Sequence, residues 1–167
     1  MTETVAQAAS GAETRSIVVE EVFPHAPDVV WKVLTDGELI ARVLMPPSGF
    51  APVPGTRFTF QTKPAGGWDG TIQCQVLDVV PCERLVYSWK GGHADNIGYG
   101  SLLDTIVTWS LSPTEGGTRL RLEHAGFALP RNESAFTTMS SGWKTVVPRI
   151  APLLDQVDRD ENEGPAP

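Results

Sequence analysis

Residues 132–157 read NESAFTTMSSGWKTVVPRIAPLLDQV, and apolar side chains recur in this stretch every three or four positions. Such spacing predicts a long amphipathic helix, because it gathers the apolar side chains on one face. These side chains belong to Phe136, Met139, Trp143, Val146, Val147, Ile150, Leu153 and Leu154. Gly142 weakens the helix, and Pro148 and Pro152 each remove a backbone donor, so we expect a kink.

The segments before this helix alternate between apolar and polar residues, as strands with one buried face do. A first strand is expected at residues 16–23, and two short helices follow it, on either side of a break at Asp36 and Gly37. Five further strands come next, joined by glycine-rich turns that favour hairpins. The predicted fold is therefore α+β, with a curved antiparallel sheet wrapped around the long C-terminal helix.

Length and composition indicate one globular domain. The chain has 167 residues, of which 41% are hydrophobic and 20% are charged, a balance typical of a soluble protein with its own core. We assign residues 16–157 to this domain. Residues 1–15 are expected to form a disordered N-terminal tail, and residues 158–167 a disordered acidic C-terminal tail.

Charge and targeting signals narrow the set of partners. The formal net charge of −7 disfavours nucleic acid and anionic membranes, because phosphate binding needs a basic surface. No run approaches the ~18 apolar residues that a membrane helix needs, and the N-terminus lacks an apolar signal core. We expect a cytoplasmic protein that is a monomer or a weak homodimer, since apolar residues are sparse on the outer sheet face.

The sequence has no motif for metal, cofactor or covalent chemistry. His25, His93 and His124 form no helical pair of ligands, whereas a metal site needs three or four converging side chains. Cys74 falls in the inward phase of a strand, where a thiol is more often inert. Ser101 lacks the strand–turn–helix context of a nucleophile elbow. We expect neither a metal nor a cofactor.

His124 ends the inward row of the last strand, after Leu120 and Leu122. Two interpretations of this histidine stay open. In one, His124 is a polar contact or an acid–base group in an apolar cavity. In the other, it is a core histidine whose neighbours satisfy its hydrogen bonds.

An aromatic set occupies inward positions of successive strands and of the helix face opposite. The candidate ligand-binding residues are Phe58, Phe60, Tyr87, Trp89, Trp109, His124, Phe136, Met139 and Trp143. For most of these residues, simple core packing is the better explanation. Gly142 and the helix prolines favour a cavity, because a glycine leaves space and a kinked helix cannot close flat against a sheet. The glycine-rich loop at residues 91–100 has the length of a gate.

Five stretches stand in a characteristic order along the chain: VVEEVFPHAPDVVWKVLTDGELI, FAPVPGTRFTF, GTIQCQVLDVVPCERLVYSW, TIVTWSLSPTEGGTRLRLEHAGF and SGWKTVVPRIAPLL. Together they resemble the START-like helix-grip (SRPBCC) superfamily, in the branch of the heat-shock-protein ATPase activator homologues. The resemblance implies a helix-grip fold with a cavity for a small apolar or aromatic molecule. The chain departs from the pattern at ARVLMPP, which lacks a common tryptophan, and at Glu21, which replaces a common arginine.

Three functions are compatible with this reading. We favour a bacterial protein that binds a small apolar or aromatic molecule without turnover. The alternative is a cyclase- or hydrolase-type enzyme that uses His124 or Glu21 as its acid–base group. A co-chaperone ranks last, because only about 15 residues precede the first strand, too few for the additional domain of the eukaryotic activators.

Overall fold

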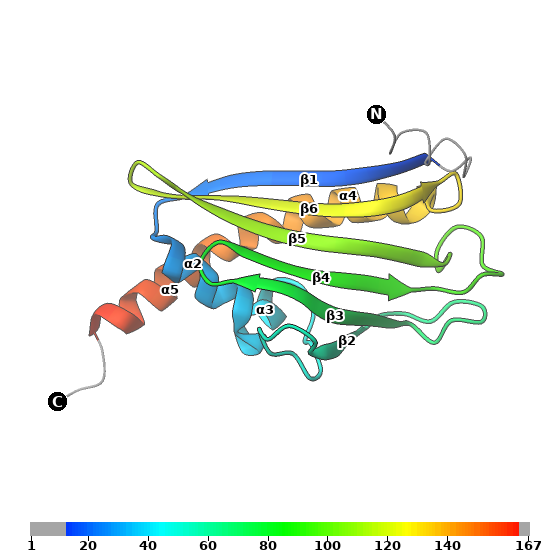
Figure 1. Ribbon diagram of the computed structural model, residues 1–167, viewed down its shortest axis with the longest axis horizontal. Coiled ribbons are helices and arrows are strands. Elements are labelled where there is room, and N and C mark those ends of the chain that lie inside the picture. The colour runs from blue at the N-terminus through cyan, green and yellow to red at the C-terminus, as the bar shows by residue number, and fades with distance from the viewer. Residues whose placement is uncertain (1–12, 164–167) are drawn as a thin grey trace.

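The computed structural model describes residues 13–163, and its helices all lie on one side of a curved sheet (Figure 1). The first elements are β1 (Glu13–Phe23), α2 (Pro27–Thr35) and α3 (Gly37–Val43). The strands that follow are β2 (Arg57–Gln61), β3 (Thr71–Val80), β4 (Arg84–Gly91), β5 (Leu103–Thr114) and β6 (Gly117–Leu129). The C-terminal segment consists of α4 (Glu133–Val146), a 3-10 turn η1 (Val147–Arg149) and α5 (Ile150–Glu163).

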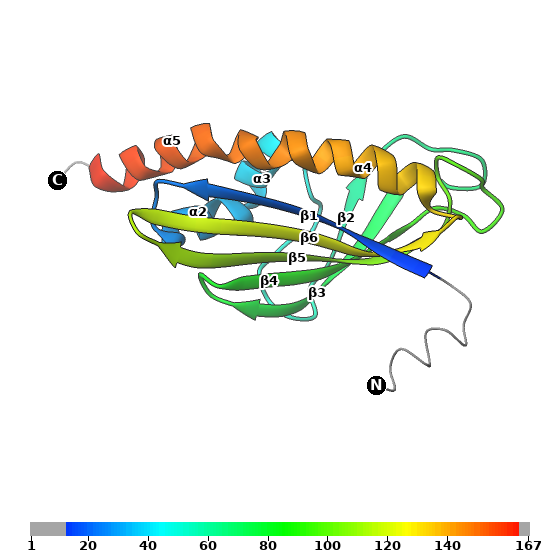
Figure 2. The ribbon, with the colours of Figure 1, turned by 90° about the horizontal axis from the view of Figure 1, so that it is seen from above.

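All neighbouring strands pair antiparallel, in the order β1-β6-β5-β4-β3-β2. β1 pairs with β6, so the first and last strands of the chain lie side by side. The predicted α+β class, element order and helix-grip architecture are confirmed. The helical segment runs along the concave face of the sheet (Figure 2).

The long C-terminal helix is interrupted at Pro148, one of the two prolines at which a kink was expected. This residue is in η1, where its missing N–H interrupts the α-helical hydrogen bonds and the backbone narrows to a 3-10 turn. Pro152 falls in the first turn of α5, where a missing donor is tolerated. The structure therefore shows an interruption of the α-helix at Pro148 and none at Pro152, and the segment is two α-helices rather than one.

At both ends of the described residues, β1 and α5 include residues that the sequence analysis assigned to the tails. β1 begins at Glu13, inside the tail assigned to residues 1–15, because its first residues pair with the end of β6. α5 continues to Glu163, inside the tail assigned to residues 158–167. His25 contacts this part of α5, with Nε2 at 2.9 Å from Asp155 Oδ1 and Nδ1 at 2.9 Å from Asp158 Oδ2. The rest of both predicted tails lies outside the described residues.

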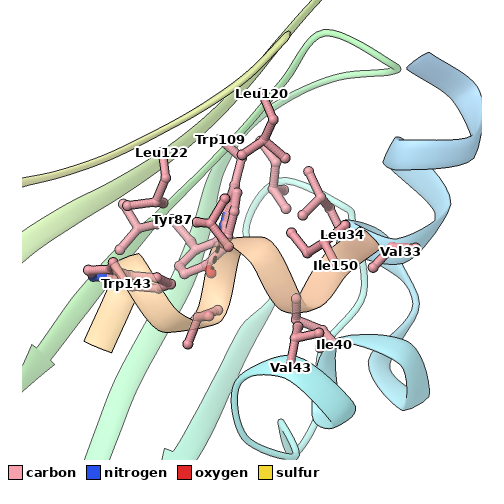
Figure 3. Close-up of a cluster of buried hydrophobic side chains, with 14 of the residues drawn as sticks. Val33, Leu34, Ile40, Val43, Tyr87, Trp109, Leu120, Leu122, Trp143 and Ile150 are labelled. Atoms are coloured by element: carbon pink, nitrogen blue, oxygen red, sulfur yellow. Dashed lines mark hydrogen bonds between the residues drawn. The ribbon is translucent and has the colours of Figure 1, made fainter. Parts of the chain in front are cut away.

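The core lies between the inner sheet face and the helices (Figure 3). Tyr87, Trp109, Leu120 and Leu122 point inward from the sheet toward Trp143 and Ile150, with Val33, Leu34, Ile40 and Val43 entering from the short helices. α5 packs on α2, whereas α4 packs on β1 and β6. No helix within residues 13–163 is long and apolar enough to cross a membrane.

Candidate functional site

A cavity of about 220 Å³ lies beside α4, between this helix and the strands β3 to β5. α4 packs on β1 and β6, at one side of the sheet, and the sheet curves along the helical segment (Figure 2). The cavity lies between α4 and the strands farther from it. The lining residues are Leu44, Met45, Thr62, Trp68, Ile72, Trp89, Gly91, Gly92, Tyr99, Gly100, Ser101, Leu103, Ser134, Ala135, Thr138, Met139, Gly142, Trp143 and Val146. An engineered cavity of roughly 150 Å³ binds benzene, so this one has room for a small ring system.

Gly142 contributes open space at the helix side of the cavity. A Cβ built on this residue would meet no atom within 4 Å. Nearer the start of the same helix, the lining residues Ser134, Ala135 and Thr138 also have short side chains, whereas Met139, Trp143 and Val146 are larger. The expectation that Gly142 leaves space beside α4 agrees with this geometry.

The loop at residues 91–100 forms one wall and is bonded to the loop between β2 and β3. Tyr99 Oη donates to the Lys63 carbonyl at 2.7 Å, and Asn96 Nδ2 donates to the Ala65 carbonyl at 2.8 Å. The Tyr99 ring lies 5.9 Å from that of Trp68, measured between centroids. Trp68 and Tyr99 therefore line the cavity from two loops that hold each other in place.

Asn132 ties this wall to the start of α4. It is 2% exposed. Its Oδ1 accepts from the Ala128 N–H at 2.9 Å, and its Nδ2 donates to Ser101 Oγ at 3.0 Å and to the Leu102 carbonyl at 2.9 Å. An asparagine before a helix is typical of a local cap, but the side chain makes no such bond here. The sequence could not indicate these distant partners.

His124 is fully buried, and both of its ring nitrogens have partners. Nδ1 accepts from Trp143 Nε1–H at 3.0 Å, and Nε2 lies 2.8 Å from Thr105 Oγ1. Thr105 Oγ1 in turn donates to the Trp89 carbonyl at 2.7 Å, so its lone pairs are free to accept from His124. This assigns the neutral tautomer with the proton on Nε2.

Burial lowers the pKa of His124 to about 3, because the charged imidazolium would lose its hydration. With no exposed surface and no lining atom in the cavity, His124 matches the interpretation of a satisfied core histidine. The second acid–base candidate, Glu21, is an exposed residue of β1 opposite Leu120 and also lies outside the lining.

Three of the nine predicted ligand-binding residues line the cavity, namely Trp89, Met139 and Trp143. The lining does not include Phe58, Phe60, Tyr87, Trp109, His124 or Phe136. All but Phe136 are buried in the core, where Trp109 Nε1 donates to Tyr87 Oη at 3.0 Å. Phe136 is partly buried and carries the Arg15 guanidinium over its ring, 4.9 Å from the centroid.

Strand alternation explains why most of the predicted residues are buried on the inner face but only some of them line the cavity. It predicts which face a side chain occupies, but the cavity covers only one end of the inner face. Trp68 and Tyr99 were missed because loops carry no periodicity. Cys74 is buried on β3, and burial raises the pKa of its thiol to about 12, so it stays a protonated core residue as expected.

Comparisons with known proteins agree with this architecture. The family model described as "Activator of Hsp90 ATPase homolog 1-like protein" matches residues 24–155. The crystal structure of MLL2253 from Mesorhizobium loti is 35% identical, with a TM-score of 0.73 over 85% of this chain and 98% of that chain. CalU16 from Micromonospora echinospora is 26% identical, with a TM-score of 0.62 over 90% of this chain and 85% of its own.

DynU16, from the dynemicin biosynthetic locus, is 23% identical with a TM-score of 0.64, and shares the fold over 84% of this chain and 47% of its own. No protein of curated function matches the sequence. The family match spans most of the described residues and coincides with the sheet, the short helices and the C-terminal helix. The chain therefore belongs to the family of Activator of Hsp90 ATPase homolog 1-like proteins, within the START-like helix-grip superfamily.

Proposed function

We propose that this protein binds one small, uncharged apolar or aromatic molecule in the cavity beside α4, without converting it. The observation that carries the proposal is the lining itself. Among the described residues that line it are three tryptophans but no Asp, Glu, Lys, Arg or His. Such a surface favours an apolar guest, because a charged guest would lose its hydration and gain no opposite charge.

The same lining supports binding over catalysis. Proton transfer requires an acid or base within hydrogen-bond reach of the substrate. Both ring nitrogens of His124 are hydrogen-bonded, to Trp143 and Thr105, and the residue has no exposed surface. Glu21 lies on β1 and is not a lining residue. Apart from the tryptophans, the polar side chains among the lining residues carry hydroxyls, as Thr62 and Thr138 do.

Filling the cavity from α4 tests the proposal. Gly142→Phe places a ring in the open space beside the helix and replaces a glycine by a better helix former. Ser141→Phe is the matched control, since Ser141 is exposed on the same helix and is not a lining residue. We would titrate both variants and the unmodified protein with the bicyclic hydrocarbon indane, using calorimetry.

We expect indane to bind the unmodified protein and Ser141→Phe alike, and Gly142→Phe to bind it about tenfold more weakly or worse, a loss of about 1.4 kcal/mol. Equal affinities in all three proteins would place the ligand elsewhere and refute the assignment of this cavity. If neither indane nor its ketone, 1-indanone, binds the unmodified protein, the proposed ligand class is wrong.

A further inference from the structure

The indole N–H of Trp89 is buried without a hydrogen-bond partner among residues 13–163. Trp89 is 3% exposed, on β4. Three other indoles of the fold each donate, Trp68 to the Thr71 carbonyl at 2.9 Å, Trp109 to Tyr87 Oη at 3.0 Å and Trp143 to His124 Nδ1 at 3.0 Å. Among the described residues, the fold thus provides acceptors for three other indole N–H groups but none for that of Trp89. A buried donor without a hydrogen-bond partner is rare and needs an explanation.

The rings that surround Trp89 offer no free lone pair. The ring centroids of Phe60, His124 and Trp143 lie 5.4, 5.2 and 5.8 Å from the Trp89 ring. His124 is the one ring of the three with acceptor chemistry, and both of its nitrogens are already bonded to Trp143 and Thr105. An acceptor for this N–H therefore has to come from outside the core.

The cavity is where such an acceptor can arrive, because Trp89 is one of its lining residues. The indole nitrogen itself is buried, so an acceptor reaches it only if lining side chains shift. Met45 and Met139 line the same cavity, and their unbranched thioether side chains rearrange easily.

We propose that the Trp89 indole N–H donates to a hydrogen-bond acceptor on the bound molecule. This inference rests on the proposed function and specifies its ligand class. The cavity selects neutral molecules that carry a carbonyl, an ether oxygen or an aromatic ring nitrogen over hydrocarbons of the same shape. A carboxylate is excluded, because the described lining has no cation to compensate its lost hydration.

The test compares two probes of nearly one shape, indane and 1-indanone, which differ by a carbonyl oxygen. Each is titrated into the unmodified protein, Trp89→Phe and Trp68→Phe. Trp68→Phe is the matched control, because Trp68 lines the same cavity but its N–H is already held by Thr71. The readout is the ratio of the two dissociation constants within each protein, which cancels the change in ring area common to both probes.

We expect the preference for 1-indanone over indane to fall about fivefold in Trp89→Phe and to stay unchanged in Trp68→Phe, as loss of one hydrogen bond predicts. Should both probes bind while the ratio is equal in all three proteins, the inference is wrong and the proposed function stands. If neither probe binds the unmodified protein, both fail.

A nuclear magnetic resonance measurement keeps the test independent of how well Trp89→Phe folds. The indole ¹H–¹⁵N signal of Trp89 in the unmodified protein is expected to move downfield with 1-indanone and to stay in place, apart from ring-current effects, with indane. A signal that responds identically to both bound probes would overturn the inference.

Discussion

Replacing His124 by leucine should flatten the pH dependence of folding. In the folded protein burial holds the pKa of His124 near 3, against 6.5 for the free side chain. At pH values between 3 and 6.5, His124 therefore binds a proton in the unfolded chain and stays neutral in the folded chain. The stability that the neutral histidine contributes is complete above pH 6.5 and is lost progressively as the pH falls toward 3.

The magnitude follows from this pKa difference. Between pH 6.5 and about 5 the unfolded state gains about 2 kcal/mol over the folded state through this one residue, at 1.36 kcal/mol for each pH unit. Other groups that titrate in this range are common to both proteins and cancel in the comparison. His124→Leu removes the effect, although it also leaves the Trp143 N–H without its acceptor and costs about 1–3 kcal/mol at neutral pH.

Urea unfolding followed by circular dichroism at pH 7 and pH 5 measures both effects. The unmodified protein should lose about 2 kcal/mol more than His124→Leu between the two pH values. Leu122→Val is the control, since it changes the same inner face of β6 without removing a titrating group and should keep the full pH dependence. Identical pH dependence in the unmodified protein and His124→Leu would refute the assignment of a neutral, buried histidine.

Three further substitutions test the packing around the site. Gly142→Ala should raise the free energy of unfolding by about 0.5–1 kcal/mol, because a glycine in a helix is unfavourable and the added Cβ meets no atom within 4 Å; a lower thermal midpoint would contradict this. Asn132→Ala removes three hydrogen bonds and should cost about 2–3 kcal/mol in urea unfolding, with a loss below about 0.5 kcal/mol arguing against the described contacts. Tyr87→Phe leaves the buried Trp109 N–H without an acceptor and should cost about 1–3 kcal/mol, which denaturant titration would reveal and an unchanged midpoint would disprove.

The predictable part of the molecule is the part governed by local periodicity. Phe58, Phe60, Tyr87, Trp89 and Trp109 are all buried on the inner face, as predicted, because alternation along a strand depends only on backbone geometry. The interruption of the α-helix at Pro148 follows equally directly from the missing backbone donor.

The site was harder to predict because distant contacts define it. Its loop wall is held by Asn96, Tyr99 and Asn132, whose partners lie about thirty residues away in sequence. The role of His124 depends on which residues form hydrogen bonds with its two ring nitrogens. The strand pattern does not indicate that these residues are Thr105 and Trp143. Residue types indicated what these side chains could do, and tertiary structure decided which of those possibilities is realised.

The hydrogen-bond chain from Trp143 through His124 and Thr105 to the Trp89 carbonyl crosses from α4 to β6, β5 and β4. Apolar contacts are non-directional and would tolerate small rotations or axial slips of α4 over the sheet. A hydrogen bond of 3.0 Å does not, since it weakens steeply when its angle departs from linearity. The hydrogen-bond chain therefore fixes the position of α4 relative to β6, β5 and β4, and with it the backbone frame of the cavity.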